Sequence, residues 1–139
     1  DRAISIGKTS STAIVLRNRD DVKSLERILK NKGCDATVIN RETPGYPYIK
    51  TVYLTTFHAA KGLEFENVFV PFLSSDKFPD PETINSALSE DEAYANEIKL
   101  LYVAATRSKY GLYMTYSGTL TPLFPTEADS YDAVEEDAL

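Results

Sequence analysis

Two polar stretches of the sequence carry the residue types that could perform chemistry. The first, TFHAAKGLEF at residues 56–65, places a His, a Lys and a Glu between two apolar runs, TVYLTT and VFVPF. The second, LLYVAATRSK at residues 100–109, places Arg107 at the end of an expected helix. Ligands of open α/β sheets gather where strands end, so we expect a site built from these two stretches.

Arg107 has the chemistry needed to assist phosphoryl transfer. Negative charge redistributes on the γ-phosphate in that reaction, and an arginine supplied by a neighbouring domain commonly stabilises it. The small residues Ala104, Ala105 and Thr106 leave room for another surface to approach. The alternative is a structural cation at a helix C-terminus, which the helix dipole favours, and position alone favours this alternative.

The turn inside KGLEF offers polar groups for a ligand. Gly62 allows a tight backbone turn, and Glu64 could accept hydrogen bonds from ligand hydroxyls or be an exposed loop acid. The only histidine, His58, is by itself expected to be a structural residue. A zinc site needs several Cys or His ligands, and the sequence has one of each, so we expect no metal site in this chain.

Length and composition predict one globular domain. A chain of 139 residues with 42% hydrophobic and 26% charged residues can form one core. No apolar run reaches the length of a membrane span, and the N-terminus has no signal-peptide pattern. The single Cys34 excludes an internal disulfide, which fits a reducing cytoplasm.

The net charge of −6 argues against strong nucleic-acid binding by the chain alone. Six of the acids lie from Glu127 onward, where there is no base, so the remaining body is neutral. Such a body can place a few basic and polar groups on a phosphate backbone, but it is expected to bind DNA weakly by itself.

The hydrophobic pattern predicts an α/β domain at residues 12–124. Short apolar strands alternate with helices, which indicates a mostly parallel sheet covered by helices on both faces. The expected strands are 13–16, 36–39, 49–55, 68–72 and 110–117, and the expected helices are 20–33 and 90–106. Asp20 or Asp21 is expected to cap the first helix. The second is expected to be largely buried, with one face formed by Tyr94, Ile98, Leu101 and Tyr102.

The remaining segments are expected to be irregular. Residues 1–11 are predicted to be a loose leader, and their IGKTS sequence is not a P-loop because Arg2 stands where the first glycine is needed. RETPGYPY at residues 41–48 is a turn-rich connector, and residues 74–89 are a polar loop. Residues 125–139 form an acidic tail that is expected to be disordered.

Three segments resemble motifs of one enzyme family. TFHAAKGLEFENVFV resembles motif V of the UvrD/Rep/PcrA-type superfamily I DNA helicases, LLYVAATRSKYGLYMTYS resembles motif VI, and AIVLRNRDDVKSLERIL is similar to motif IV. They occur in the family order and cover roughly Thr12 to Phe124. The resemblance implies a C-terminal RecA-like domain with a P-loop NTPase fold that lacks its own P-loop. The RETPGYPY connector stands where UvrD-type helicases insert a large accessory domain.

For ATP, the resemblance implies that Arg107 reaches the γ-phosphate as an arginine finger. Arg17 matches the first arginine of motif IV, and the second falls on Lys23, which lacks the bidentate fork of arginine. Lys23 could still serve, Arg19 could substitute for it, or the enzyme could rely on Arg107. The family uses the glutamate that matches Glu64, beside Gly62, at the ribose or nucleotide edge. Magnesium would be held by an N-terminal RecA-like domain.

For DNA, the resemblance implies that Thr56 and His58 contact a single strand. A hydroxyl and an imidazole can hydrogen-bond phosphate oxygens without reading sequence. Lys61 is grouped with them, although pairing with an acid is its more expected role. Aromatic stacking also binds single strands, but Tyr46, Tyr48 and Phe78 are only weak candidates, and packing is the more expected role of Phe78.

The resemblance implies an ATP-dependent DNA helicase that is active only as a full-length protein. Its partners would be single-stranded DNA and the N-terminal RecA-like domain, with no membrane. One alternative is a motor that serves a partner, as in a helicase–nuclease fusion or an RNA polymerase-associated relative. Another is a degenerate, non-catalytic binding module.

Overall fold

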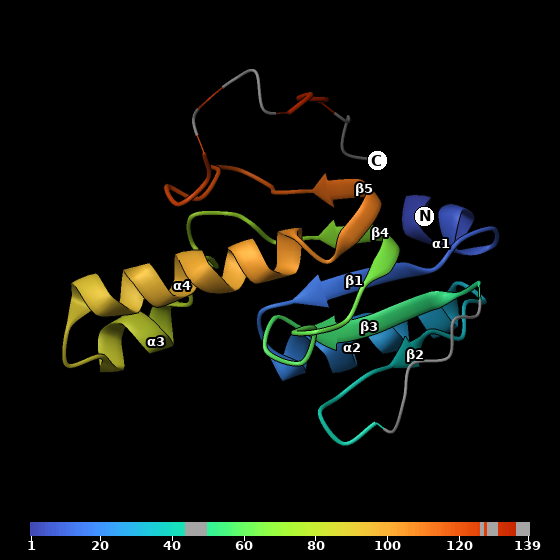
Figure 1. The fold of residues 1–139 in the computed structure, drawn as a ribbon, viewed down its shortest axis with the longest axis horizontal. Coiled ribbons are helices and arrows are strands. Elements are labelled where there is room, and N and C mark those ends of the chain that lie inside the picture. The colour runs from blue at the N-terminus through green and yellow to red at the C-terminus, as the bar shows by residue number, and fades with distance from the viewer. Residues whose placement is uncertain (44–49, 126, 128–130, 136–139) are drawn as a thin grey trace.

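Five strands form one parallel sheet in the computed structural model of the chain (Figure 1), which describes residues 1–43, 50–125, 127 and 131–135. The strands are β1 (Thr12–Leu16), β2 (Thr37–Val38), β3 (Val52–Thr56), β4 (Phe65–Val70) and β5 (Ser108–Met114). Their order across the sheet is β2–β3–β1–β4–β5, and every neighbouring pair is parallel. The predicted parallel α/β sheet is confirmed.

Helices cover both faces of this sheet, as predicted. Four are described: α1 (Arg2–Gly7), α2 (Arg19–Asn31), α3 (Pro81–Ser86) and α4 (Glu90–Ala105). Alternate side chains of the buried central strand β1 enter two separate cores. Ala13 and Val15 join the core that includes residues of α4, whereas Ile14 and Leu16 join the core that includes residues of α1 and α2.

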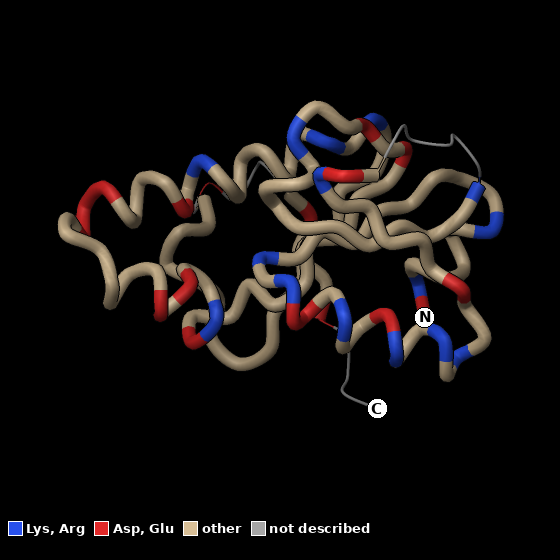
Figure 2. Tube along the Cα trace, turned by 90° about the horizontal axis from the view of Figure 1, so that it is seen from below, with Lys and Arg blue, Asp and Glu red and all other residues tan. Residues whose placement is uncertain are grey.

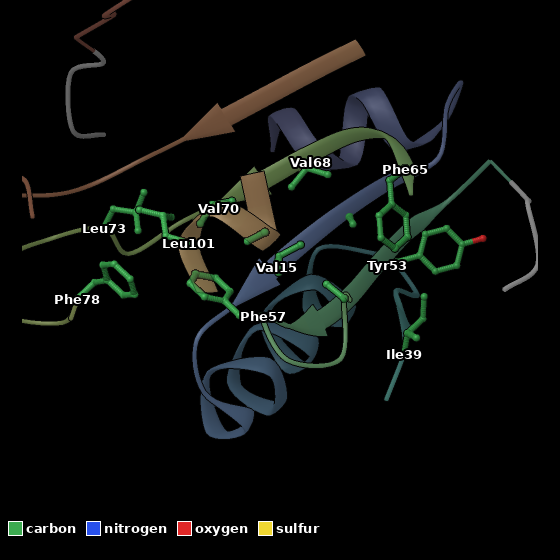
Figure 3. Packing of buried hydrophobic residues seen from close by; sticks show 13 residues of the cluster. Val15, Ile39, Tyr53, Phe57, Phe65, Val68, Val70, Leu73, Phe78 and Leu101 are labelled. Atoms are coloured by element: carbon green, nitrogen blue, oxygen red, sulfur yellow. The ribbon is translucent and has the colours of Figure 1, made fainter. Parts of the chain in front are cut away.

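The core on the α4 side is built around aromatic rings from two strands and two loops. Figure 3 shows Phe57, Val70 and Leu101 pointing toward one another between the sheet and the helix. Phe78 is 1% exposed and its ring lies 5.9 Å from that of Phe57, so the packing role favoured for Phe78 is confirmed. This core anchors the segment that follows β3 against the segment that precedes α3.

Local capping interactions account for where helix α2 begins and ends. Asn18 occupies the N-cap position, so the predicted cap at Asp20 or Asp21 is wrong by two or three residues, and both acids lie instead in the first turn, where they favour the helix dipole. Gly33 has φ +76°, and the N–H of Cys34 donates to the carbonyl of Leu29 at 2.9 Å. The predicted termination by glycine is confirmed, because this is the hydrogen bond of a Schellman motif.

The buried face of α4 differs from the predicted one. Its buried residues are Ala93, Glu97, Leu101 and Ala104, at helical spacings of four, four and three. Ile98 and Tyr102 are 47% and 69% exposed, so the prediction that they share the buried face was wrong. The buried face is rotated about the helix axis relative to the predicted one, because an acid, Glu97, occupies a position in the core.

Several element boundaries also shift. β4 begins at Phe65 and β5 at Ser108, two to three residues before the predicted strands, and the loop predicted at 74–89 contains the short helix α3. The connector RETPGYPY, with Tyr46 and Tyr48, and the acidic tail fall largely outside the described residues. None of the described helices has both the length and the apolar character needed to cross a membrane.

The segment predicted as a loose leader is instead the helix α1. Ala3 and Gly7 are buried one helical turn apart, and α1 packs on β1 and β3. A Cβ atom added at Gly7 would lie 2.5 Å from Cγ2 of Val52, so the helix approaches the sheet closely where it has no side chain. The pattern was missed because a buried glycine leaves no hydrophobic signal.

Replacing Gly7 by alanine is therefore expected to destabilise the chain. Overpacking a close contact costs about 1–3 kcal/mol, and urea unfolding monitored by circular dichroism would measure it. The matched control is Ser5→Ala on the exposed side of the same helix, which should change the unfolding free energy by less than about 0.5 kcal/mol. Equal stability of the two variants would contradict close packing of α1.

Candidate functional site

The two polar stretches found in the sequence meet at the junction of α4 and β5. Arg107 donates from Nε to the carbonyl of Val103 at 2.9 Å and from Nη1 to the carbonyl of Leu63 at 3.4 Å. A backbone hydrogen bond also connects the two stretches, since the N–H of Phe65 donates to the carbonyl of Arg107 at 2.9 Å. The KGLEF turn and the end of the α4 helix therefore form one unit.

Neutral oxygens hold the guanidinium of Arg107. Its third hydrogen bond, from Nη2, goes to the hydroxyl of Thr106 at 3.1 Å. Within the described residues, no carboxylate lies at ion-pair distance from Arg107. The side chain of Arg107 is half-buried and held in one orientation, but no acid among the described residues neutralises its charge. The guanidinium is therefore able to bind an external anion.

Lys61, Gly62 and Glu64 of the KGLEF turn are exposed, whereas Phe65 is buried. Gly62 has φ +82°, the left-handed conformation that glycine adopts without strain. Glu64 is paired with Lys109 at 3.3 Å, with both side chains about half exposed, so this pair contributes little to stability. Lys61 is exposed, and no ion pair involves it among the residues that the structure describes, so its expected pairing with an acid is not seen there.

A second group of predicted residues lies elsewhere, at the carboxyl ends of β1 and β3. Arg17, Lys23, Thr56 and His58 line one open cleft with a volume of about 600 Å³. Thr56 starts the turn that follows β3, because its hydroxyl accepts from the N–H of Ala59 at 3.2 Å. Two predicted nucleotide residues and two predicted DNA residues thus share a cleft.

The sheet separates this cleft from Arg107. Leu16, just before Arg17, pairs with Thr56 at the end of β3, whereas Ser108, just after Arg107, pairs with Phe65 at the start of β4. Because all strands are parallel, Arg17 lies at the carboxyl ends of the strands, whereas Arg107 lies at their amino ends, on the opposite side of the sheet. The structure therefore does not bring the two predicted nucleotide arginines together, and residues 57–64 run from one edge to the other.

Arg17 is held by a buried acid that the sequence did not reveal. Its Nη2 lies 2.7 Å from Oε1 of Glu97, and its Nε lies 3.1 Å from both oxygens of that carboxylate. The side chains of Arg17 and Glu97 are 16% and 1% exposed. Glu97 also accepts from the N–H of Asp80 at 3.0 Å. The pair therefore joins the end of β1, the start of α3 and the middle of α4.

Asp80 extends this network and caps α3. Its carboxylate accepts from the N–H of Thr83 at 3.0 Å and from the hydroxyl of Thr83 at 2.7 Å. Burial alone would raise the pKa of Asp80, but the Thr83 hydrogen bonds, a bond from Asn18 and the charge of Arg17 together hold it below its usual value. The sequence carried a signal for this cap, because Asp before Pro81 is typical of a helix start.

His58 is exposed at the rim of the cleft, and its pKa is lowered. Partial burial of the ring is the main cause, the charges of Arg17 and Arg41 act in the same direction, and Glu97 opposes them. The lowered pKa favours the neutral imidazole, which can both donate and accept a hydrogen bond. Since the folded state disfavours the charged ring, the folded chain loses stability as pH falls below the ordinary histidine pKa.

This lowered pKa gives a direct test of DNA contact at His58. We expect an NMR titration of its Cε1 proton to give a pKa below the ordinary histidine value in the DNA-free protein. A nearby DNA phosphate favours the imidazolium form, so saturating single-stranded DNA should raise that pKa. A pKa that stays the same when DNA binds would place His58 away from the phosphate backbone.

Basic and acidic residues are mixed along the chain. In the view of Figure 2, the positions of Lys and Arg are interspersed with those of Asp and Glu along the chain trace. Among the described residues, no group of three or more His, Cys, Asp and Glu side chains is placed to hold a metal ion. We therefore assign no step to a metal held by these residues.

The parallel sheet and the helices on its two faces define an α/β domain of the RecA-like class. A family model described as the UvrD-like helicase C-terminal domain matches residues 35–119, which include both the KGLEF turn and Arg107. The match covers more than half of the chain, so the chain belongs to the UvrD-like helicase C-terminal domain family.

Similar proteins agree with this family. The chain is 42% identical over 47% of its length to a "probable DNA helicase II homolog" of Mycoplasma genitalium, and 39% identical over 48% to the "ATP-dependent DNA helicase PcrA" of Staphylococcus aureus. These matches span only 9% of each relative, so the chain corresponds to a small part of their length. A crystal structure of the C-terminal domain of a possible DNA helicase from Lactobacillus plantarum aligns with 82% of this chain and 60% of that one, with a TM-score of 0.57 and 27% identity.

Proposed function

We propose that this chain is the C-terminal motor domain of an ATP-dependent superfamily I DNA helicase and supplies Arg107 to ATP bound between two RecA-like domains. The observation that carries the proposal is the fixed orientation and the uncompensated charge of the Arg107 guanidinium. Its guanidinium is oriented by two backbone carbonyls and a hydroxyl, and no acid of the described chain neutralises it. A pre-positioned cation of this kind stabilises charge that develops on a transferring phosphoryl group.

The surface beside Arg107 supports docking of a second domain. Ile98, Tyr102 and Thr106 follow one another at four-residue spacing on the outer side of α4, and Tyr102 is 69% exposed. Thr106 accepts a hydrogen bond from Arg107 itself. We assign this stripe to the N-terminal RecA-like domain, which would also hold the magnesium that accompanies ATP.

Lys23 and Arg17 take different roles in this proposal. Arg17 is compensated by Glu97, so we assign it a positioning role at the end of β1 rather than a phosphate contact. Lys23 is exposed in the cleft with Thr56 and His58, at the edge of the sheet opposite Arg107. Its placement there favours a contact to a DNA phosphate over a contact to the γ-phosphate.

The KGLEF turn is the proposed link between nucleotide and DNA. The turn belongs to the segment of residues 56–65, which starts at Thr56 in the cleft and ends at Phe65, whose N–H donates to the carbonyl of Arg107. A movement of Arg107 when ATP closes the two domains would therefore be transmitted to residues 57–64. Coupling through such a segment requires two discrete arrangements of it, which ATP-bound and ATP-free states would supply.

The first test is ATP turnover by the full-length protein with and without single-stranded DNA. We expect DNA to stimulate turnover, and we expect this chain alone to hydrolyse no ATP because it has no P-loop. Turnover that is equal with and without DNA would favour the alternative of a motor that serves another partner. A full-length protein that does not bind ATP would favour a non-catalytic module.

A further inference from the structure

We infer that Phe72 is a stacking platform for an unpaired base of single-stranded DNA. This inference rests on the proposed helicase function and adds a contact that neither the sequence motifs nor the family match assigns. Phe72 follows β4 at the carboxyl edge of the sheet. It is 41% exposed, although the pattern VFVPF favours burial.

The backbone of Phe72 is held in an unfavourable conformation. Its φ is +66°, and it is the only non-glycine residue with a positive φ in the described part of the chain. Bulky side chains rarely adopt this left-handed region, and such strain concentrates at ligand-contacting sites. The strain here turns a large apolar ring toward solvent instead of into the core, which folding alone does not require.

The Phe72 ring lies beside the cleft that contains the proposed DNA-binding residues. Phe72 shares one pocket with Arg17 and Asn18 and a second with Tyr116, which is 54% exposed. Arg17 in turn lines the cleft of Thr56 and His58. The lining residues of these pockets include segments that follow β3, β1, β4 and β5, and these neighbouring strands all end on the same side of the sheet (Figure 1).

The chemistry around Phe72 fits a base better than a phosphate. Nζ of Lys77 lies 4.9 Å from the ring centroid, a cation–π contact that adds positive charge at the ring. Asp21, Asp76 and Asp80 line the same pocket and would repel a phosphate. Every base has a π-face, so stacking on an aromatic ring binds single strands without sequence preference.

The test compares DNA binding by Phe72→Gly and Phe72→Tyr in the full-length protein. Phe72 belongs to neither of the two cores, and glycine adopts a positive φ without strain, so this variant removes the ring and should remain folded. Fluorescence anisotropy should show that Phe72→Gly binds labelled oligo(dT) about 5- to 150-fold more weakly than wild type, the range that loss of one stacked base gives. Phe72→Tyr keeps the ring and should bind within about twofold of wild type.

An abasic oligonucleotide of equal length separates stacking from a general effect. We expect Phe72→Gly and wild type to bind it equally, because it has no base to stack. Phe72→Asn, which also tolerates the left-handed conformation, provides a second variant without the ring. Unchanged oligo(dT) binding by both variants, or an equal loss on oligo(dT) and on the abasic strand, would overturn the inference while leaving the helicase proposal intact. A wild-type protein that binds no single-stranded DNA would overturn both.

Discussion

Arg107→Ala in the full-length protein is expected to lower DNA-stimulated ATP turnover by about a thousand-fold or more, which is the scale of a lost arginine finger. The reason is geometric. The guanidinium is already oriented by the carbonyls of Val103 and Leu63, so it can meet the developing charge without reorganising. Turnover measured with a coupled ATPase assay at saturating ATP and DNA would give the loss directly.

Two measurements distinguish a loss of the chemical step from a loss of ATP binding or of the fold. ATP binding by Arg107→Ala should weaken far less than turnover falls, because the cation acts mainly in the transition state. Arg107→Lys keeps the charge but not the fork that reaches several acceptors, so it should recover only a small part of the activity. If Arg107→Ala folds, binds ATP and turns over at the wild-type rate, Arg107 is a structural cation at the end of α4.

The fold was largely predictable because its signals are local. Most strands contain a short apolar run, and the parallel arrangement follows from helices between strands. The two polar stretches were also found, since both the KGLEF turn and Arg107 stand out from their neighbours in sequence. The face of α4 was not predictable in the same way. Glu97 is buried only because Arg17, eighty residues away in the sequence, meets it in space.

The remaining misses have a similar physical origin. That Arg17 and Arg107 lie at opposite edges of the sheet follows from strand order and register, which no local pattern encodes. The positive φ of Phe72 has no sequence signal either, because that conformation is expected of glycine or asparagine. Helix α1 was missed since Gly7 packs through the absence of a side chain.

Glu97→Ala is expected to destabilise the chain by about 3–5 kcal/mol, the cost of leaving one member of a buried ion pair without its partner. Arg17, which is 16% exposed beside Glu97, would lose the carboxylate with which it forms an ion pair, and the N–H of Asp80 would lose its acceptor. This is a large share of the roughly 5–15 kcal/mol that holds a typical domain folded. Urea unfolding of the 139-residue chain, followed by circular dichroism, would measure the loss.

A double variant tests whether the pairing itself carries this stability. Replacing a buried ion pair by apolar residues of similar volume is often neutral or stabilising, so Arg17→Met with Glu97→Leu should recover most of the loss. Glu97→Gln keeps the shape and one acceptor oxygen but removes the charge, and it should lie between wild type and Glu97→Ala. A loss below about 1 kcal/mol for Glu97→Ala would mean that water reaches Arg17. In that case the end of β1 is not locked to α4, and Arg17 would regain the freedom to bind an external phosphate.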